Sequence, residues 1–271
     1  MNKEKLSVII ISFNSAKILT KNLEVLIDEN LFNFVIVDNA SDDDSSEVIK
    51  IRFPNVKLIS LQQNVGYGRA ANLAIKSITT PFALLLNPDL STSCQDINKL
   101  VNFAENDTSS AIWGPATNPI DYDNCGFESV EWISGCAMLF DVKKFVKVGL
   151  FDENFFLFFE ETDLCKRVIN AGYSIKLCRN IFFDHNKGKA CKPTPEINWL
   201  RNWHYGWSKC YFYAKHKPDD IKRIATRQYK QYRRKWLMSL KNRTKYKAQA
   251  AGVKAFILGQ KAFNADGTPN R

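Results

Sequence analysis

The first 90 residues alternate between continuous apolar runs and segments in which apolar residues recur every three or four positions. Apolar runs of strand length occupy residues 6–11, 34–37, 56–61 and 82–86. Such runs are typical of strands that are buried on both faces of a sheet. Helical spacing follows the first run, at Ala16, Leu19 and Leu23. This order predicts an α/β fold with a mostly parallel sheet flanked by helices.

Polar residues follow each of the four predicted strands. These residues are Ser12, Asn14, Asp38, Asn39, the segment 64–69 and the segment 87–89. In a parallel sheet, ligands bind outside the carboxyl ends of the strands. Each residue alone could equally be a turn or helix-cap residue. Their recurrence at four consecutive strand ends predicts a pocket for a polar ligand.

The chain beyond residue 130 has a less regular pattern. Residues 132–140 predict a strand with a kink at Gly135. Residues 164–170 predict a helix that Asp163 opens and that Gly172 ends, since glycine is a common residue after a helix C-terminus.

Three carboxylates follow the apolar run at residues 155–159. They are Glu160, Glu161 and Asp163. Carboxylates next to such an apolar run are unfavourable unless they meet a cation or take up a proton. This segment is therefore the strongest indication of an active site that the residues give by themselves.

Positive charge is concentrated at the C-terminal end of the chain. The 271 residues carry a net charge of +10. Residues 1–200 contain 20 Lys and Arg against 25 Asp and Glu, whereas residues 201–271 contain 18 against 3. We therefore expect a main domain over residues 1–200 and a basic helical extension over residues 201–271. Such an extension indicates contact with an anionic surface, either a membrane or a nucleic acid.

Residues 218–247 predict one basic amphipathic helix. Its apolar positions are Ile221, Ala225, Tyr229, Tyr232, Trp236 and Leu240. One interpretation is an interfacial helix on anionic lipid, and an equal alternative is a helix packed on the protein with a solvated basic face. Nucleic-acid binding is favoured by charge alone, without a motif, so we do not expect it. The aromatic residues at 199–207 could line an acceptor site or belong to the core.

The sequence contains no apolar stretch near the roughly 20 residues that a membrane span requires. Its seven cysteines include no C-x-x-C pair, so reduced thiols in a cytoplasmic protein are the simplest expectation. Peripheral association with the inner face of the membrane is compatible with the basic extension.

Seven segments, taken in order, resemble the family 2 glycosyltransferases. They are VIIISFNSA, VDNASDDDS, QNVGYGRAAN, LLLNPDL, WISGCAMLF, GLFDENFFLFFEETDLCKRVINAGY and DHNKG. The resemblance spans about residues 5–188 and is strongest to the branch that contains bacterial rhamnosyltransferases of cell-wall and O-antigen assembly.

This resemblance implies a GT-A, Rossmann-like fold with a nucleotide-sugar half at about residues 1–90 and an acceptor half at about 91–200. It implies inverting transfer of a sugar from dTDP-rhamnose or a UDP-hexose to a hydroxyl. The acceptor is a glycan or polyprenyl-linked molecule in bacterial cell-surface polysaccharide synthesis, such as O-antigen or capsule.

The resemblance also implies a divalent metal, Mg²⁺ or Mn²⁺, bound through Asp89 and His185. Carboxylate and imidazole groups are suitable ligands, and the metal would act as a Lewis acid on the diphosphate. Asn87 stands where the family's D-x-D motif has its first Asp, so one charged ligand is replaced.

The catalytic base of the family corresponds to Glu161, and Asp163 either orients the acceptor or caps the helix. Asp38 corresponds to a nucleoside contact, and Ser12 and Asn14 lie in the loop that holds base and ribose. Arg69 meets the nucleoside or the diphosphate. The remaining residues expected to bind the nucleotide sugar are Asn39, Asn64, Gly66, Asn87 and Gly135.

Two other classes of protein are alternatives. Residues 66–71 match G-x-G-x-x-A and are followed by Asp89 about 20 positions on, which is typical of dinucleotide-binding oxidoreductases. That class leaves the carboxylates at 160–163 unexplained. The second alternative is a catalytically silent protein on the same fold that binds lipid or nucleic acid, and Asn87 keeps it open.

Overall fold

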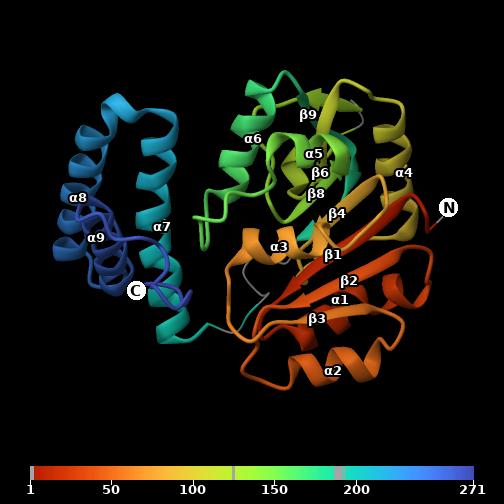
Figure 1. Ribbon diagram of the computed structural model, residues 1–271, viewed down its shortest axis with the longest axis horizontal. Coiled ribbons are helices and arrows are strands. Elements are labelled where there is room, and N and C mark those ends of the chain that lie inside the picture. The colour runs from red at the N-terminus through yellow and green to blue at the C-terminus, as the bar shows by residue number, and fades with distance from the viewer. Residues whose placement is uncertain (1–2, 124–125, 186–190, 192) are drawn as a thin grey trace. The chain divides into compact units, whose positions relative to one another are not determined.

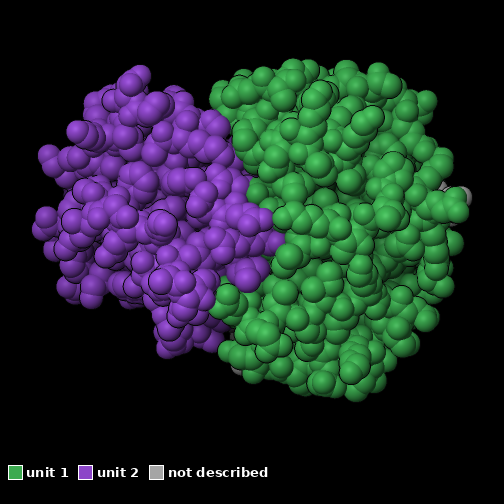
Figure 2. All heavy atoms as spheres, in the orientation of Figure 1, with its two compact units in different colours: residues 1–64, 70–151, 164–192 green, residues 65–69, 152–163, 193–271 purple. Residues whose placement is uncertain are grey.

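The computed structural model describes residues 3–123, 126–185, 191 and 193–271. The chain divides into two compact units, which Figure 2 colours separately. Unit 1 comprises Met1–Asn64, Ala70–Phe151 and Leu164–Lys192. Unit 2 comprises Val65–Arg69, Asp152–Asp163 and Pro193–Arg271. The chain therefore leaves unit 1 twice for short segments before it enters unit 2 for good.

Unit 1 contains an eight-stranded mixed sheet with the order β3-β2-β1-β4-β8-β6-β9-β7 (Figure 1). The bounds are β1 Leu6–Ser12, β2 Asn33–Asp38, β3 Lys57–Ser60, β4 Phe82–Leu86, β6 Ser110–Ala116, β7 Phe127–Ser129, β8 Ala137–Asp141 and β9 Ser174–Phe182. Strands β1 to β4 pair in parallel, whereas β8 is antiparallel to both β4 and β6. The four strands predicted in the first 90 residues are thus confirmed as one parallel half of the sheet.

The helices that lie wholly or mostly in unit 1's part of the chain follow the strands closely. They are α1 Ala16–Asp28, α2 Ser45–Arg52, α3 Tyr67–Ile75, α4 Cys94–Glu105, α5 Val142–Val148 and α6 Glu160–Asn170. The first residues of α3 and α6 belong to unit 2. On one face of the sheet, Val8 and Ile10 pack in a single core with Leu19 of α1 and Ile97 of α4. This core fixes the strands whose carboxyl ends carry the predicted ligand-binding residues.

A short two-stranded sheet brings two distant segments of unit 1 together. Strand β5 Leu90–Ser91 pairs antiparallel with β10 Asp184–His185, and His185 lies opposite Leu90. Because Leu90 directly follows Asp89, this pairing places His185 beside the carboxylate predicted to bind metal.

Two predicted elements of the middle region have different bounds. The strand expected at 132–140 begins only at Ala137, because a turn at Gly135 and Cys136 precedes it. The helix expected at 164–170 begins at Glu160, so Asp163 lies inside its first turn. Acidic residues in a first turn are favoured by the helix dipole, which explains the earlier start.

Unit 2 is built on three helices, α7 Pro195–His216, α8 Ile221–Met238 and α9 Arg243–Ile257, which are drawn in blue at the end of the chain in Figure 1. Helices α7 and α9 lie with their backbones in close contact. A Cβ atom at Gly206 would come within 2.2 Å of the Gln249 carbonyl oxygen, and one at Gly252 within 2.0 Å of the Trp203 oxygen. Only glycine allows this approach at both positions.

The basic extension differs from the single helix predicted at 218–247. Helix α8 ends at Met238 and α9 begins at Arg243. Ala225 and Tyr232 of the predicted apolar face are buried against residues of α7 and α9, such as Cys210 and Val253. The structure therefore supports the packed alternative for this face. The position 200/201 expected as a boundary falls inside α7.

The aromatic residues at 199–207 contribute mostly to the core of unit 2. Trp203 and Trp207 are buried in a cluster with Phe156. In the part of the chain that the structure describes, no helix combines the length and apolar character needed to cross a membrane. No disulfide joins the described cysteines; Cys125 lies outside the described residues.

Candidate functional site

The strand ends of β1, β2 and β3 bring several predicted donor-binding residues of unit 1 together. Ser12 pairs with Asp38 in the parallel register of β1 and β2. The Asn39 backbone N–H donates to the Ser12 carbonyl at 2.8 Å, and the Asn39 side-chain amide donates to Asn64 Oδ1 at 3.0 Å. Ser12, Asp38 and Asn39 are buried. The predicted gathering of polar groups at these ends is therefore present in the structure.

Asn14 extends this group through the loop that follows β2. Its backbone has φ 52, in the left-handed region that asparagine tolerates better than most residues. The Asn14 backbone N–H donates to Ser41 Oγ at 2.9 Å, and its side-chain amide donates to Asp42 Oδ1 at 2.5 Å. Ser41 Oγ in turn donates to Asp38 Oδ1. The loops after β1 and β2 are thus linked into one polar surface.

Asp89 and His185 form a close pair in unit 1. The His185 Nε2 atom lies 3.4 Å from Asp89 Oδ1, and Asp89 is 1% exposed. The hydrogen bond with Asp89, together with one to Cys136, raises the pKa of His185 to about 9. A buried carboxylate and a histidine are therefore held together by the β5–β10 pairing.

These two side chains fit a divalent cation that also has oxygen ligands from a diphosphate. Mg²⁺ is commonly held by one or two carboxylates plus substrate phosphates, and imidazole and carboxylate suit Mn²⁺. No group of three or more His, Cys, Asp or Glu side chains arranged for a metal occurs among the described residues. A metal at Asp89 and His185 would hence depend on ligands from the substrate.

Asn87 and Gly135 lie at the junction of β4 and β8. The Asn87 backbone N–H donates to the Cys136 carbonyl at 2.8 Å, and the Leu90 N–H donates to the Asn87 carbonyl at 3.2 Å. Gly135 is in the turn immediately before β8. Both are therefore backbone neighbours of the Asp89 segment in unit 1.

Gly66 and Arg69 belong to unit 2, where they pack on the segment 152–163. Gly66 has φ +86, and a Cβ atom there would lie 2.3 Å from the Phe156 carbonyl oxygen. The Arg69 Nε atom donates to the Glu153 carbonyl at 2.6 Å, and its guanidinium lies over the Phe263 ring at 3.6 Å. The glycine thus serves a close contact between backbones, and the predicted donor contact of Arg69 stays a prediction.

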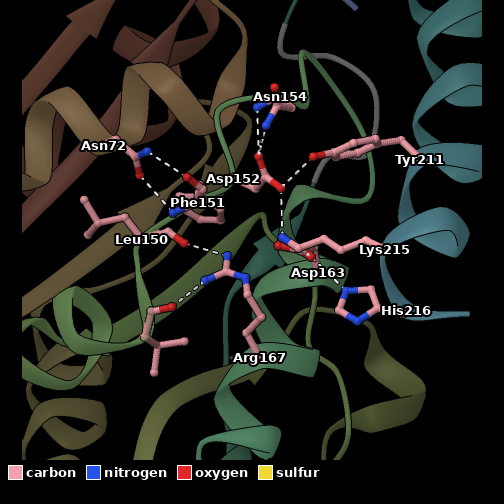
Figure 3. Close-up of polar contacts among 11 residues, drawn as sticks. Asn72, Leu150, Phe151, Asp152, Asn154, Asp163, Arg167, Tyr211, Lys215 and His216 are labelled. Atoms are coloured by element: carbon pink, nitrogen blue, oxygen red, sulfur yellow. Dashed lines mark hydrogen bonds and ion pairs between the residues drawn. The ribbon is translucent and has the colours of Figure 1, made fainter. Parts of the chain in front are cut away.

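Asp163 is fully buried and lies against the Lys215 ammonium and the His216 imidazole at the end of α7 (Figure 3). Its Oδ1 atom lies 2.8 Å from Lys215 Nζ and 2.8 Å from His216 Nε2. The predicted helix cap is wrong, because α6 begins at Glu160 and Asp163 lies inside its first turn. The predicted role of Asp163 in orienting the acceptor stays a prediction. Asp163 fixes the start of α6 to the end of α7.

Lys215 also connects Asp163 to Asp152, as Figure 3 shows. The Lys215 Nζ atom donates to Asp152 Oδ2 at 2.8 Å, and the Tyr211 hydroxyl donates to the same oxygen at 3.2 Å. Burial alone would raise the pKa of Asp152, but the Lys215 and Asn154 hydrogen bonds outweigh it and lower the pKa. No sequence pattern predicts these contacts of Lys215, His216 and Tyr211, which are more than 50 residues from their partners.

Glu160 and Glu161 have a different environment from Asp163. Glu160 is 5% exposed, and its Oε2 atom has no hydrogen-bond partner among the described residues. Burial and the nearby Glu161 carboxylate raise the pKa of Glu160 well above its ordinary value. Burial also raises the pKa of Glu161, against hydrogen bonds from its own and the Thr162 backbone N–H. Each of these two carboxyl groups therefore has a raised proton affinity, which in its deprotonated form suits a general base.

The solved structures similar to this chain define its fold. A mannosyltransferase, PcManGT from Pyrobaculum calidifontis in complex with GDP-Man and Mn²⁺, matches with a TM-score of 0.60 and 14% identity, over 97% of this chain and 77% of that one. S. aureus TarS 1–349 in complex with UDP-GlcNAc matches with a TM-score of 0.59 and 15% identity, over 94% and 92%. The fold of this chain is thus the GT-A fold.

Sequence comparisons give the family. The sequence profile of Glycosyl transferase family 2 matches residues 7–159, and the chain belongs to this family. It is 25% identical over 213 residues to the low-salt glycan biosynthesis hexosyltransferase Agl10 of Haloferax volcanii, covering 68% of each chain.

A second relative is the N-acetylglucosaminyl-diphospho-decaprenol L-rhamnosyltransferase of Mycobacterium tuberculosis. It is 24% identical over 196 residues, which cover 54% of this chain and 63% of the relative. The predicted family and GT-A fold are confirmed, and the chain is a glycosyltransferase rather than an oxidoreductase. The first glycine of the G-x-G motif that suggested an oxidoreductase, Gly66, packs against the Phe156 backbone.

Proposed function

We propose that this glycosyltransferase moves a sugar with inversion from a nucleotide diphosphate sugar to an acceptor hydroxyl. The donor is dTDP-rhamnose or a UDP-hexose, and the acceptor is a glycan or a polyprenyl-linked molecule of bacterial cell-surface polysaccharide synthesis, including O-antigen and capsule. The relatives named above support this range, because one acts on a diphospho-decaprenol and another in glycan biosynthesis, according to their names.

The observation that carries the proposal is the environment of Glu161. Direct displacement at a sugar carbon requires a base that removes the proton of the acceptor hydroxyl. Glu161 is a carboxylate with a raised pKa, and no cation lies within ion-pair distance of it among the described residues. It can therefore accept a proton during the reaction. Asp163 is unsuited to the role of base because its carboxylate is already paired with Lys215 and His216.

The residues of unit 1 are assigned to the donor. Asp38, with Ser12 and Asn14, would bind the nucleoside, and Asn39, Asn64, Asn87 and Gly135 would shape the surrounding surface. Gly66 and Arg69 complete the proposed set. Asp89 and His185 would hold Mg²⁺ or Mn²⁺, which as a Lewis acid would offset the charge that develops on the departing nucleoside diphosphate.

The location we propose is cytoplasmic and peripheral on the inner face of the membrane. The α8–α9 turn supports it, because Leu237, Met238 and Leu240 are 70%, 71% and 94% exposed among basic residues. Exposed apolar side chains with a basic rim fit an anionic bilayer surface.

Leu237→Ser with Leu240→Ser should weaken binding to anionic vesicles, and unchanged binding would contradict this location. We expect no nucleic-acid partner.

The proposed activity is tested with the purified full chain and a panel of nucleotide sugars, in the presence of Mg²⁺ or Mn²⁺. We expect one donor to raise the melting temperature and to be hydrolysed slowly without acceptor. A metal-free sample is the control for the cation. If no nucleotide sugar binds or is consumed, the enzyme proposal fails and a catalytically silent protein on the same fold becomes the better hypothesis.

A further inference from the structure

A pocket of about 570 Å³ lies in unit 2 among α7, α8, α9 and Phe158. Four basic side chains line it, Arg201, Lys209, Lys235 and Lys245, and none of the described residues that line it is acidic. No carboxylate lies within ion-pair distance of these four cations among the described residues. The pocket therefore concentrates positive charge that the protein does not neutralise.

The remaining walls of the pocket are aromatic and amide groups. Tyr205 packs edge-on against Phe158 at 5.5 Å between ring centroids, and Arg201 lies 6.0 Å from the centre of the Phe158 ring. One lining residue, Gln249, is 5% exposed, and its side-chain amide donates to Asn202 Oδ1 at 3.2 Å. Amide groups beside cations that no carboxylate neutralises suit an anionic ligand.

A second hollow of about 530 Å³ continues from this pocket toward the α8–α9 turn. The two share Gln231, Lys235 and Tyr246, and the second is also lined by Met238. Met238 is 71% exposed and is followed by Leu240, which is 94% exposed. The basic pocket thus continues into a hollow next to exposed apolar side chains, which is the arrangement an amphiphile with an anionic head requires.

One wall of the pocket is close in sequence to the proposed base. Phe158 lines the pocket and precedes Glu161 by three residues. Three residues of chain span at most about 11 Å, a length comparable with that of a sugar diphosphate. A sugar attached to an anion in the pocket therefore has the Glu161 segment within reach.

We infer that this pocket binds the diphosphate of a polyprenyl-diphosphate-linked acceptor sugar, with its lipid chain directed over the α8–α9 turn. The inference rests on the proposed function, since it gives that function's acceptor a site. Lys209, Lys235, Lys245 and Arg201 would contact the phosphate oxygens, for which guanidinium and ammonium groups are the usual partners. The aromatic wall would contact the sugar and the first isoprene units.

The test measures binding of farnesyl diphosphate, inorganic pyrophosphate and farnesol to the full chain by calorimetry. We expect farnesyl diphosphate to bind at least tenfold more tightly than either of the other two. Equal affinity for pyrophosphate and farnesyl diphosphate would overturn a lipid-linked ligand. Displacement of farnesyl diphosphate by a short single-stranded oligonucleotide at lower concentration would overturn the inference in favour of nucleic acid.

Charge removal identifies the pocket as the binding site. Lys235→Gln with Lys245→Gln changes two exposed side chains, so folding should be unaffected, and farnesyl diphosphate affinity should fall by about tenfold or more. The matched control is Arg227→Gln with Lys230→Gln, which removes the same charge from exposed positions of α8 outside the pocket. The control should stay within twofold of the unchanged protein. An equal loss in both variants, or no loss in the first, would overturn the inference.

The donor response separates this inference from the proposed function. Both double variants should bind the nucleotide sugar as the unchanged protein does. If the donor binds and the pocket variant keeps its affinity for farnesyl diphosphate, the pocket is not the binding site of the lipid diphosphate. The enzyme proposal then stands. If farnesyl diphosphate binds in the pocket but no nucleotide sugar binds, the enzyme proposal fails by itself.

Discussion

The carboxylates at the strand ends of unit 1 and those of the segment 152–163 in unit 2 have contrasting partners. Asp38 accepts a hydrogen bond from Ser41, and Asp89 lies 3.4 Å from His185. In unit 2, Asp163 has Lys215 and His216, whereas Glu160 and Glu161 have no cation within ion-pair distance among the described residues. Proximity in sequence is thus a poor guide to the environment of a carboxylate. Glu161 and Asp163 are two residues apart but differ more in their partners than Asp89 and Asp163 do.

This difference in partners indicates which carboxylates can change their protonation state in a reaction. A carboxylate beside a cation stays ionised and serves structure or metal binding. A buried carboxylate without one has a raised pKa and can exchange a proton at a moderate pH. This comparison assigns Asp89 and Asp163 to contacts with basic side chains and Glu160 and Glu161 to proton transfer.

Replacing the proposed base should have the largest effect. Glu161→Gln keeps the size of the side chain but cannot accept a proton, so we expect transfer to fall by about 100-fold or more. Donor affinity should remain nearly unchanged. In the unchanged enzyme, kcat/KM should rise with pH through the raised pKa of Glu161, and this rise should disappear in the variant.

The control is Glu131→Gln, which removes an exposed glutamate of unit 1. It should retain full activity. Full activity of Glu161→Gln would instead move the base to Glu160, since Asp163 is already paired.

Removing the Asp163 carboxylate should lower the free energy of unfolding, and its chemical effect on activity should be smaller. Asp163→Asn leaves Lys215 and His216 without their buried carboxylate, and we expect a loss of about 3 kcal/mol in the free energy of unfolding. Urea denaturation measures it. Asp220→Asn, which breaks the exposed pair with Arg223, should cost less than about 1 kcal/mol. Similar losses in both variants would show that burial of Asp163 is not decisive.

Removing the carboxylate of the Asp89 and His185 pair should weaken metal binding. Asp89→Asn takes the only charged ligand from a set of two, so Mn²⁺ affinity in the presence of donor should fall by at least about tenfold. Titration followed by electron paramagnetic resonance measures this affinity. Asp184→Asn, at the exposed neighbouring position, is the control. Unchanged Mn²⁺ binding by Asp89→Asn would exclude this pair as the metal site.

The smallest expected effect is a gain in stability from Glu160→Gln. The folded state raises the pKa of Glu160, so the native protein loses stability as pH rises from about 4.5 through that higher pKa. Glutamine does not titrate, and the variant should be more stable at pH 8 by about 1 kcal/mol. At pH 4 the difference should vanish. A variant less stable than the unchanged protein at pH 8 would mean that the carboxylate has a partner in solution.

The parallel half of the sheet and its polar strand ends could be predicted because both are local in sequence. Each strand is followed within a few residues by the groups that it positions, and parallel register then aligns Ser12 with Asp38. The contacts of Asp163 could not be predicted, because Lys215 and His216 lie more than 50 residues away and no spacing links them.

The C-terminal helices were predicted less well, for two different physical reasons. Residues 239–242, Ser-Leu-Lys-Asn, contain neither Gly nor Pro, so the break between α8 and α9 has only the weaker signals of Ser239 and the helix-cap residue Asn242. Helix α7 did have one, because Trp199, Trp203 and Trp207 recur every fourth residue. That spacing predicts a helix, and the sequence analysis missed it.

The path of the chain between the two units limits how the protein can be divided. Unit 2 includes Val65–Arg69 and Asp152–Asp163, which are inserted between segments of unit 1. Truncating the basic extension would remove Trp203, Trp207 and Lys215 and leave Phe156 and Asp163 without their partners. Exchange of the extension between relatives would therefore have to carry both short segments with it, so these three stretches of sequence are expected to evolve as one inheritable module.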